Sequence, residues 1–262
     1  MKYYVVSDVH GYYTVLEETL RGAGFFEDPV PNKLIVCGDL LDRGTEANRM
    51  VDFMLQLLEE GRLILVKGNH EDLMVQCLQE VARGRAYDIA IGMSHHYSNG
   101  TWDTLLQIAN MSESDAIRMP NELVGRVMRS PFYTRLLSAC MDYFETPHYI
   151  FTHGWIPCHT EGYKPYTNYA YDPDWRTADV DAWRRARWFN GMEVACQYHV
   201  TEPNKTVVSG HWHTAYGHAC IEHRGTEWGI HADFSPFYAE GIIAIDASTA
   251  NSGKMNCLVI ED

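Results

Sequence analysis

The chain has 262 residues, enough to bury a large core as one α/β domain. Its 35 acidic and 21 basic side chains give a formal net charge of -14, which disfavours non-specific binding to nucleic acid or to anionic membranes. The seven cysteines are scattered and never spaced as CxxC, so the sequence supports neither a disulfide framework nor a zinc ribbon.

The first 84 residues contain the same unit three times: a short apolar run, a polar turn with glycine, and apolar residues at helical spacing. Strands are predicted at 2–6, 34–37 and 63–66, and the turns that follow them read SDVHG, GDLLDRG and GNHE. Alternating strands and helices predict a largely parallel sheet with right-handed crossovers. In such sheets ligands bind beyond the carboxyl ends of the strands, which is where all three polar turns fall.

Cap and stop signals predict where the first three helices begin and end. Thr14 and Glu17 have the spacing of a capping box for the first helix, and Thr45 is placed to cap the second. Apolar side chains recur on one face of the second and third helices: Met50, Met54, Leu57 and Leu58, then Met74, Cys77, Leu78 and Val81. Glycines are expected to end the three helices, namely Gly22 or Gly24, Gly61 and Gly84.

The rest of the chain is expected to complete a single domain, 1–262, with two insertions. Residues 85–146 read as mostly helical and are predicted to form a cap. A second cap or insertion region is predicted at 158–200, where a loop rich in Tyr, Pro and Asp precedes a helix with the sequence DAWRRARWF. Short apolar runs predict a further set of strands, more antiparallel in character, at 148–151, 206–208, 241–245 and 257–260.

Five of the predicted strand ends carry polar side chains that could bind metal ions or phosphate. They are Asp8 and His10; Asp39, Asp42 and Arg43; Asn69 and His70; His153; and His211 and His213. Two pairs are spaced i, i+2, so in an extended segment both side chains project from one face and can bind one ion. Carboxylate, imidazole and amide ligands without thiolate suit manganese, iron, zinc or magnesium. About seven candidate ligands exceed the needs of one zinc, so two metals that share a carboxylate are the natural interpretation.

The ordered motifs DVH, GDLLDRG, GNHE, THG and GHWH resemble those of the calcineurin-like metallophosphoesterases. KGNHEDLM and YSNGTW are most similar to the phage and bacterial serine/threonine protein phosphatases of that superfamily. The resemblance runs from residue 8 to residue 213 and implies an αββα four-layer sandwich with a dinuclear metal centre. The implied ligands form two sets that share Asp39: Asp8, His10 and Asp39 for the first metal, and Asp39, Asn69, His153 and His211 for the second.

The motif GHWH departs from the phage-type pattern, which has a single histidine there, as GHT. In the wider superfamily the second histidine of this motif reaches the first metal. The resemblance therefore adds His213 to the predicted ligands.

The resemblance also implies a mechanism. Water bridging two divalent ions loses a proton near neutral pH and becomes a hydroxide that attacks phosphorus. Arg43 would contact the phosphoryl oxygens, and His70 would protonate the leaving alkoxide. Asp42 would fix the tautomer of His70 and favour its charged form. Phage-type enzymes have a second phosphate-contacting arginine near a tryptophan, for which Arg187 is the candidate, a solvated helix face being the alternative.

These features predict a metal-dependent phosphatase that cleaves phosphomonoesters, with phosphoserine or phosphothreonine in proteins as the expected substrates. Two divalent ions are expected as cofactors, Mn²⁺ in vitro, with Fe, Zn or Mg as alternatives. A nucleotide or dinucleoside polyphosphate hydrolase is a second interpretation, although bacterial diadenosine tetraphosphatases typically have alanine where this chain has Asp42. A phosphodiesterase is hinted at by GHWH and opposed by the acidic composition. A metal-binding scaffold without turnover would have no use for His70 as a proton donor.

The expected partner is a phosphorylated protein or a small phosphoester, and neither nucleic acid nor membrane is expected. A cytoplasmic location is predicted because no apolar run approaches the roughly 18 residues of a membrane span. The start of the chain, MKYYVVSDVH, also has too short an apolar stretch for a secretory leader. The sequence does not indicate an oligomeric state.

Overall fold

Two stacked β-sheets form the centre of the protein in the computed structural model, which describes residues 1–162 and 167–262. The first sheet has the strand order β11-β1-β2-β3. Its strands β1 (Lys2–Val6), β2 (Asn32–Cys37) and β3 (Leu63–Val66) are parallel, and β11 (Leu258–Glu261) pairs antiparallel with β1 at the edge. The three strands of the repeated unit and their parallel pairing are therefore confirmed.

The second sheet has five strands in the order β4-β5-β8-β10-β9, with bounds Phe144–Glu145, Tyr149–Phe151, Thr206–Ser209, Ile242–Ala244 and Phe237–Ala239. Pairing of β8 with β5 and with β10 is parallel, and only the edge strands β4 and β9 pair antiparallel. The expected antiparallel pairing is thus wrong for the centre of this sheet. Long crossover connections there bring the chain back to the end of the sheet where the previous strand began, so the next strand runs parallel to it. The predicted strand at 257–260 belongs to the first sheet, as β11.

Alternation of side chains along the strands divides the first sheet between two buried layers. Tyr4 and Val6 of β1 face the helices on the outer side of the sheet. Tyr3 and Val5 face the other way and pack with Val208 of the second sheet. Strands β2 and β3 repeat this pattern, so both faces of the sheet are buried.

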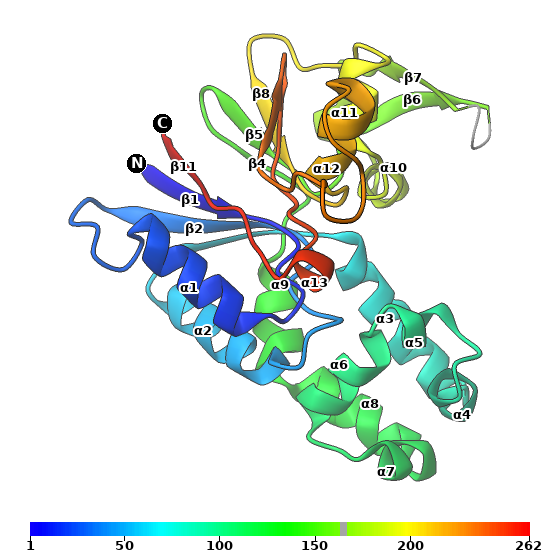
Figure 1. The fold of residues 1–262 in the computed structure, drawn as a ribbon. Helices are drawn as coiled ribbons and strands as arrows, with labels where there is room; N and C mark the ends of the chain where they lie inside the picture. Colours follow the sequence, from blue (N-terminus) through cyan, green and yellow to red (C-terminus); the bar gives the residue numbers. More distant parts are fainter. Residues whose placement is uncertain (163–166) are drawn as a thin grey trace.

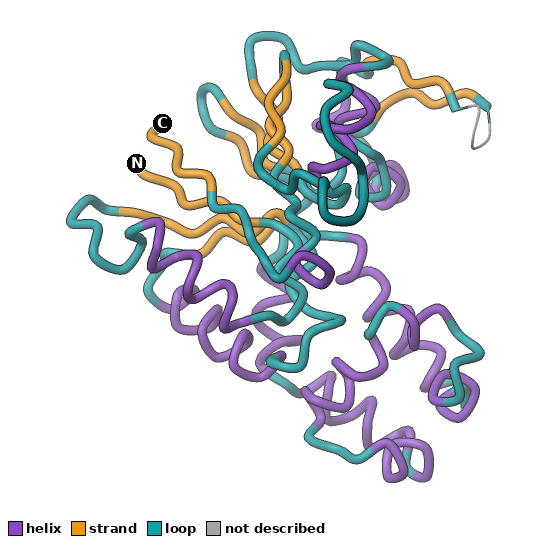
Figure 2. The backbone as a smooth tube through the Cα atoms, in the orientation of Figure 1, coloured by secondary structure: helices purple, strands orange, loops and turns teal. Residues whose placement is uncertain are grey.

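Helices cover the outer face of each sheet, which gives the four-layer αββα sandwich that the resemblance implied (Figure 1). Helices α1 (Tyr13–Ala23) and α2 (Ala47–Glu59) cover the first sheet, and α10 (Val180–Ala186) and α11 (Gly191–Cys196) cover the second. Their buried residues include Leu16 and Leu20 of α1, Met50 and Met54 of α2, Trp183 of α10 and Val194 of α11. The strands of both sheets lie between these helices (Figure 2).

The predicted N-caps of the first two helices are wrong. The backbone N–H and the hydroxyl of Thr14 both donate to Glu46, at 2.9 and 2.7 Å, while Glu17 pairs with Arg21. Helix α2 begins after Glu46, so Thr45 stands one residue too early to cap it. The structure replaces both local caps by one contact between the starts of α1 and α2.

Within the predicted cap region 85–146, residues 86–139 form a lobe of mostly short helices beside the first sheet (Figure 1), whereas 144–145 are strand β4 of the second sheet. Helices α4 to α9 span Ala86–Ala90, His95–Ser98, Thr101–Ala109, Glu113–Arg118, Pro120–Arg129 and Leu137–Ala139, with a π-helical turn at Phe132–Leu136. The lobe packs against α3 (Asn69–Ala82) and the core of the first sheet through the buried side chains of Leu105, Leu123 and Val127. The predicted helical content is confirmed, and a role of the lobe as a cap stays a prediction.

The region 158–200 begins with a hairpin where a loop was expected. β6 (Cys158–Glu161) and β7 (Asn168–Tyr171) pair antiparallel, and residues 163–166 of the expected loop lie outside the described residues. Tyr169 packs edge-on against Phe189 and Tyr198, and these partly buried rings lie against the core of the second sheet. This side chain therefore supports the core of the second sheet.

The remaining short elements are a 3₁₀ turn at Trp175–Thr177, α12 (Thr214–Tyr216), a π-helical turn at Gly217–Ile221 and α13 (Thr249–Ser252). Within 1–162 and 167–262, no helix has the length and apolar character needed to cross a membrane. All seven cysteines lie in these ranges and are free thiols.

A charged cluster joins β4 to the 3₁₀ turn. Glu145 accepts hydrogen bonds from Arg176 at 2.6 and 3.0 Å and pairs with Lys205 at 2.8 Å. These contacts, the hydrogen bond from Arg176 first, lower the pKa of Glu145 from 4.5 to about 2. A depressed pKa means that the cluster stabilises the fold above the unfolded pKa of about 4.5, and that this stabilisation is lost as the pH falls toward 2.

We expect Glu145→Gln to lower the free energy of unfolding by about 1–2 kcal/mol at pH 7, since solvent screens this partly exposed cluster. The loss should shrink at about pH 2.5, where the wild-type carboxylate is also becoming protonated. Urea unfolding at the two pH values measures the difference. Glu59→Gln breaks an exposed pair with Arg135 at 2.8 Å and serves as a control with little effect at either pH. An equal loss at both pH values would contradict this assignment.

Candidate metal centre and catalytic dyad

The carboxyl ends of parallel strands from both sheets meet and bring the predicted polar residues together. Asp8 follows β1, Asp39 follows β2, and Asn69 begins α3 shortly after β3. From the second sheet, His153 follows β5 and His211 follows β8. The backbone N–H of His211 donates to Asp8 Oδ2 at 2.9 Å, across 203 residues of sequence. The stacking of the two sheets thus assembles one site from both.

The backbone at this edge adopts the left-handed region at several non-glycine residues. Among the described residues, eleven non-glycine positions have positive φ, and six of them are predicted site residues: Asp8, His10, Asp39, Asp42, Arg43 and His211. Such conformations cost of order 1–3 kcal/mol each and persist only where surrounding contacts fix them. The fold tolerates this cost where side chains have to converge.

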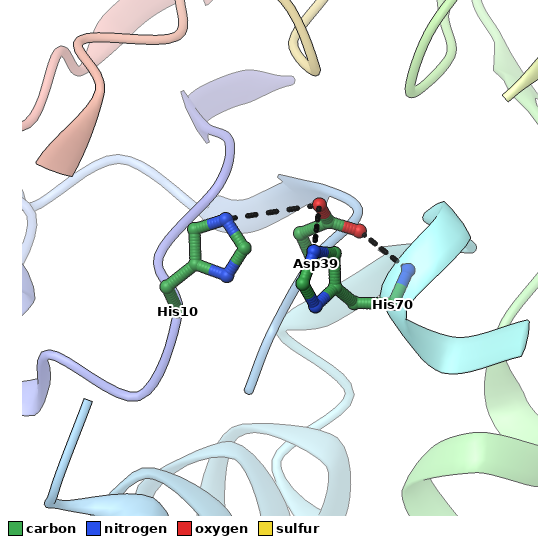
Figure 3. Close-up of side chains that lie close together, drawn as sticks. All are labelled: His10, Asp39 and His70. Atoms are coloured by element: carbon green, nitrogen blue, oxygen red, sulfur yellow. Dashed lines mark hydrogen bonds and ion pairs between the residues drawn. The ribbon is translucent and has the colours of Figure 1, made fainter. Parts of the chain in front are cut away.

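Asp39 lies at the centre of a cluster of imidazoles (Figure 3). Its Oδ2 is 3.7 Å from His10 Nε2 and 3.8 Å from His70 Nε2. The possible ligand atoms of these three residues all lie within 4.8 Å of one another. Two ligands bound at 2.0–2.2 Å to one ion are at most about 4.4 Å apart, so the group fits a metal after small side-chain adjustments.

A second group shares Asp39 and comprises His153 and His211. The Nδ1–H of His153 donates to the Cys37 carbonyl at 2.8 Å, so Nε2 of the neutral ring carries a lone pair. This nitrogen lies 3.3 Å from Asp39 Oδ1 and 2.8 Å from Asn69 Oδ1. Three ligand atoms with lone pairs converge there, and such an arrangement is suited to a cation.

Burial and charge set the protonation states of the cluster. Burial would raise the pKa of Asp39, but the surrounding imidazoles, His153 first, hold it well below its usual range, because they carry positive charge at the low pH where this carboxyl would titrate. Burial lowers the pKa of His10 and of His153, which keeps both rings neutral and able to bind metal. Burial, followed by the charges of Asp246 and Asp39, raises the pKa of Asp8. A divalent cation would supply the positive charge that these buried carboxylates need.

Asp246 belongs to this edge and was not among the predicted residues. It follows β10 as Asp39 follows β2, and burial raises its pKa to about 6. Its Oδ1 accepts the backbone N–H of Ser248 at 2.6 Å. The signal was present in the sequence, because Asp246 comes directly after the predicted strand at 241–245.

A carboxylate behind His70 orients its ring. His70 Nδ1–H donates to Asp42 Oδ2 at 2.7 Å, and the hydroxyl of Thr101 donates to the same oxygen at 2.7 Å. His70 Nε2 therefore points toward Asp39 and lies 3.4 Å from the guanidinium of Arg43. Burial would lower the pKa of His70, but the charges of Asp39 and Asp42 raise it. Thr101 lies in the YSNGTW motif, so this motif supports the His70–Asp42 dyad.

The carboxylate of the GNHE motif, which was not assigned a role, joins two of the turns. Glu71 accepts backbone N–H groups from Gly68 at 2.6 Å, Leu40 at 2.9 Å and Asp39 at 3.1 Å. It thereby holds the turn after β2 against the turn after β3. The capping-box spacing of Gly68 and Glu71 was the available signal.

We expect Gly68→Ala to reduce both stability and kcat. An added Cβ would lie 2.1 Å from Asp39 Oδ1 and 2.4 Å from Asp39 N. Overpacking of this kind costs about 1–3 kcal/mol, and here it also displaces the central carboxylate. Urea unfolding and kcat measure the two effects. Gly22→Ala in α1, whose Cβ would meet nothing within 4 Å, is the control and should stabilise by up to about 1 kcal/mol. Unchanged kcat and stability in Gly68→Ala would contradict this packing.

His213 lies apart from the two groups. Its Nε2 is 3.2 Å from Glu227 Oε1, and its ring centroid is 4.2 Å from that of Trp228. Neither of the candidate metal-binding groups found among the described residues includes His213. Its assignment as a metal ligand stays a prediction that these contacts do not support.

Arg187 is buried and engaged in ion pairs. Its guanidinium donates to Asp72 at 2.6 Å and also pairs with Asp142, while Lys67 pairs with the other oxygen of Asp72 at 2.7 Å. These contacts tie the end of α10 to α3. A role for Arg187 as a phosphate contact stays a prediction, and the alternative of a solvated helix face is wrong.

Stacked sheets whose strand ends gather imidazoles and carboxylates around a shared aspartate are the architecture of the metallophosphoesterases. The sequence model described as calcineurin-like phosphoesterase matches residues 1–215, and the chain belongs to this family.

Similar proteins in this family have different named activities. Serine/threonine-protein phosphatase 1 of Salmonella typhimurium is 31% identical over 114 residues, which cover 44% of this chain and 46% of that protein. An asymmetrical bis(5'-nucleosyl)-tetraphosphatase of Anoxybacillus flavithermus is 23% identical over 142 residues, covering 52% and 53%. The chain thus spans about half the length of these relatives. A cold-active protein-tyrosine phosphatase of a Shewanella species aligns over 100% of this chain and 75% of its own, with 18% identity and a TM-score of 0.51, which shows a shared fold.

Proposed function

We propose that this protein is a dinuclear-metal-dependent phosphatase that hydrolyses phosphomonoesters, with phosphoserine or phosphothreonine in proteins as its substrate class. The observation that carries the proposal is the position of Asp39. Its carboxylate is shared by two groups of imidazoles, and His70, held by Asp42, stands beside it. A shared carboxylate suits two metals, and an oriented imidazole suits proton transfer.

The residues that would hold the metals are Asp8, His10, Asp39, Asn69, His153 and His211, while His70, the third member of the first group, is assigned to proton transfer. When bound, two divalent ions supply a hydroxide nucleophile at neutral pH and neutralise charge on the phosphoryl oxygens. Their identity is left open by the ligands, which accept manganese, iron, zinc and magnesium. The chain itself supplies the remaining parts of the mechanism.

Arg43 and His70 are arranged for a phosphoryl group. When His70 is neutral and donates its Nδ1–H to Asp42, its Nε2 accepts a hydrogen bond from Arg43, at 3.4 Å. A phosphate is a better acceptor for a guanidinium and would draw Arg43 away. Nε2 can then be protonated, because the negative charge of Asp42 stabilises the protonated ring. The protonated Nε2 can donate its proton to the leaving alkoxide.

Dinucleoside polyphosphate hydrolysis is the second candidate, because one of the similar proteins is named for it. The two metals would neutralise the reacting phosphate, so the further phosphates of a polyphosphate chain need additional cationic side chains. Arg43 is the sole Lys or Arg among the described residues that line the cavity beside His211, whereas Asp246 and Glu227 add negative charge there. This balance favours a substrate with a single phosphoryl group.

A substrate panel with metal-depleted protein reloaded with Mn²⁺ tests the proposal. We expect hydrolysis of a phosphoserine peptide and of p-nitrophenyl phosphate, and little hydrolysis of bis(p-nitrophenyl) phosphate or diadenosine tetraphosphate. Preference for the diester or for the tetraphosphate would refute the proposed substrate class. Lack of turnover on every compound, despite stoichiometric metal uptake, would favour a scaffold.

A further inference from the structure

A cavity of about 530 Å³ opens beside the candidate metal centre. It shares Arg43 and His211 with that centre. Three tryptophans, Trp188, Trp212 and Trp228, form much of the remaining wall. A group placed in this cavity is therefore a neighbour of the reacting phosphate.

Two of these tryptophans leave large apolar areas open to solvent. Trp188, which follows α10, and Trp228 are 43% and 53% exposed. The Trp188 ring meets His211 edge-on, with 5.6 Å between centroids, and the Trp228 ring lies 4.2 Å from that of His213. Exposed indoles gathered in one hollow next to a reactive centre are typical of a binding surface.

The segment that carries Trp228 is fixed by its neighbours. Glu227 pairs with His213 Nε2 at 3.2 Å, and the His213 ring also stacks against Trp212, with centroids 6.3 Å apart. The wall thus exists before any ligand arrives, so little conformational entropy is lost on binding. His213 therefore supports the wall of this cavity from a position outside the metal centre.

The polar side chains that line the cavity indicate which class of molecule binds there. Ser98 and Asn99 donate to the His95 carbonyl and Asn251 donates to Ser248 Oγ, so their oxygens are the atoms that can accept a peptide N–H. Carboxylates of Asp246 and Glu227 line the cavity together with Arg43, so additional phosphates or acidic groups are repelled. The cavity therefore complements a neutral ring on a peptide rather than the chain of a polyphosphate.

We propose that this cavity is a specificity subsite for an aromatic side chain that flanks the phosphorylated residue of a peptide substrate. The proposal rests on the proposed function and adds a sequence preference to it. Trp188 and Trp228 provide the contact surfaces, and the amide and hydroxyl groups hold the adjoining backbone.

The test compares Mn²⁺-loaded wild type, Trp228→Leu and Trp228→Phe on matched phosphoserine peptides. Phe is placed in turn at the two positions on each side of phosphoserine, and each peptide is compared with one that carries cyclohexylalanine, which has similar size and no aromatic ring. We expect KM to be about three- to tenfold lower for Phe at one of these positions. Trp228→Leu should remove most of the difference, with Trp188 accounting for the remainder, and Trp228→Phe should keep a larger part of it. Tyr238→Leu removes a 57% exposed ring outside the cavity and should preserve the difference.

Equal KM values for the Phe and cyclohexylalanine peptides at all four positions would overturn the subsite while leaving the proposed function intact. A KM for adenosine monophosphate that rises in Trp228→Leu, with unchanged peptide discrimination, would assign the cavity to a nucleobase and also overturn it. If wild type cleaves p-nitrophenyl phosphate but none of the phosphopeptides, the proposed substrate class itself fails. These outcomes separate the two proposals.

Discussion

Asp39→Asn should abolish stoichiometric metal binding and lower kcat by about a thousandfold or more. Asp39 is the single residue that both candidate groups share, through Oδ2 near His10 and His70 and through Oδ1 near His153. An amide presents one neutral oxygen in place of two charged ones, so two sites lose a ligand together. Without bound metals, no hydroxide forms near neutral pH, and this accounts for the size of the effect.

Elemental analysis after dialysis and kcat on p-nitrophenyl phosphate measure the two losses. Asp52→Asn, on the exposed side of α2, is the matched control and should change neither quantity. The folded fraction of Asp39→Asn should be checked by urea unfolding, because Asp39 Oδ1 also accepts the His70 backbone N–H at 3.0 Å. If folded Asp39→Asn retains two metals per chain and wild-type kcat, the metal centre described above is wrong.

The layers of this fold were predictable because their signals are local. Strands 2–6 and 63–66 were predicted at their observed bounds, and alternation along them decides which side chains face the helices. Glycine stops were equally informative: Gly24 adopts a left-handed φ of 87° at the end of α1, and Gly61 and Gly84 have positive φ after α2 and α3. Periodicity and positive φ are properties of short segments, so one sequence suffices to find them.

The caps and the second sheet were mispredicted because their determinants are not local. Thr14 has its partner, Glu46, 32 residues away, whereas the capping-box rule examines only three residues. The central strands β5 and β8 are parallel, and this depends on the crossover between them rather than on the strand sequences. Such pairings are set by packing of the whole chain.

The site shows the same division between local and distant determinants. Motifs at strand ends identified Asp39, His70 and Asp42, because each motif places its own polar residue directly after an apolar run. The supporting residues were missed: Thr101 donates to Asp42 from 59 residues away, and Glu71 reaches Asp39 from 32 residues away. Their partners depend on which turns meet in space, and a single sequence does not contain that information.

His70→Asn should lower kcat by about a hundred- to ten-thousandfold while metal content stays at the wild-type level. The ring is held by Asp42 at Nδ1, so its Nε2 faces the cluster as a proton donor would. His70 also forms one candidate metal-binding group with His10 and Asp39, so a role as a ligand is the alternative. Metal content separates the two roles, since loss of a ligand releases metal and loss of a proton donor does not.

The leaving group provides a second and independent readout. An alkoxide leaving from phosphoserine needs a proton, whereas p-nitrophenolate is a much weaker base and leaves without one. The loss of kcat in His70→Asn should therefore be at least about tenfold larger for a phosphoserine peptide than for p-nitrophenyl phosphate. His159→Asn, which changes an exposed ring, is the control and should affect neither substrate. Equal losses on both substrates together with a fall in metal content would make His70 a ligand rather than the general acid, because proton donation distinguishes the two esters and metal binding does not.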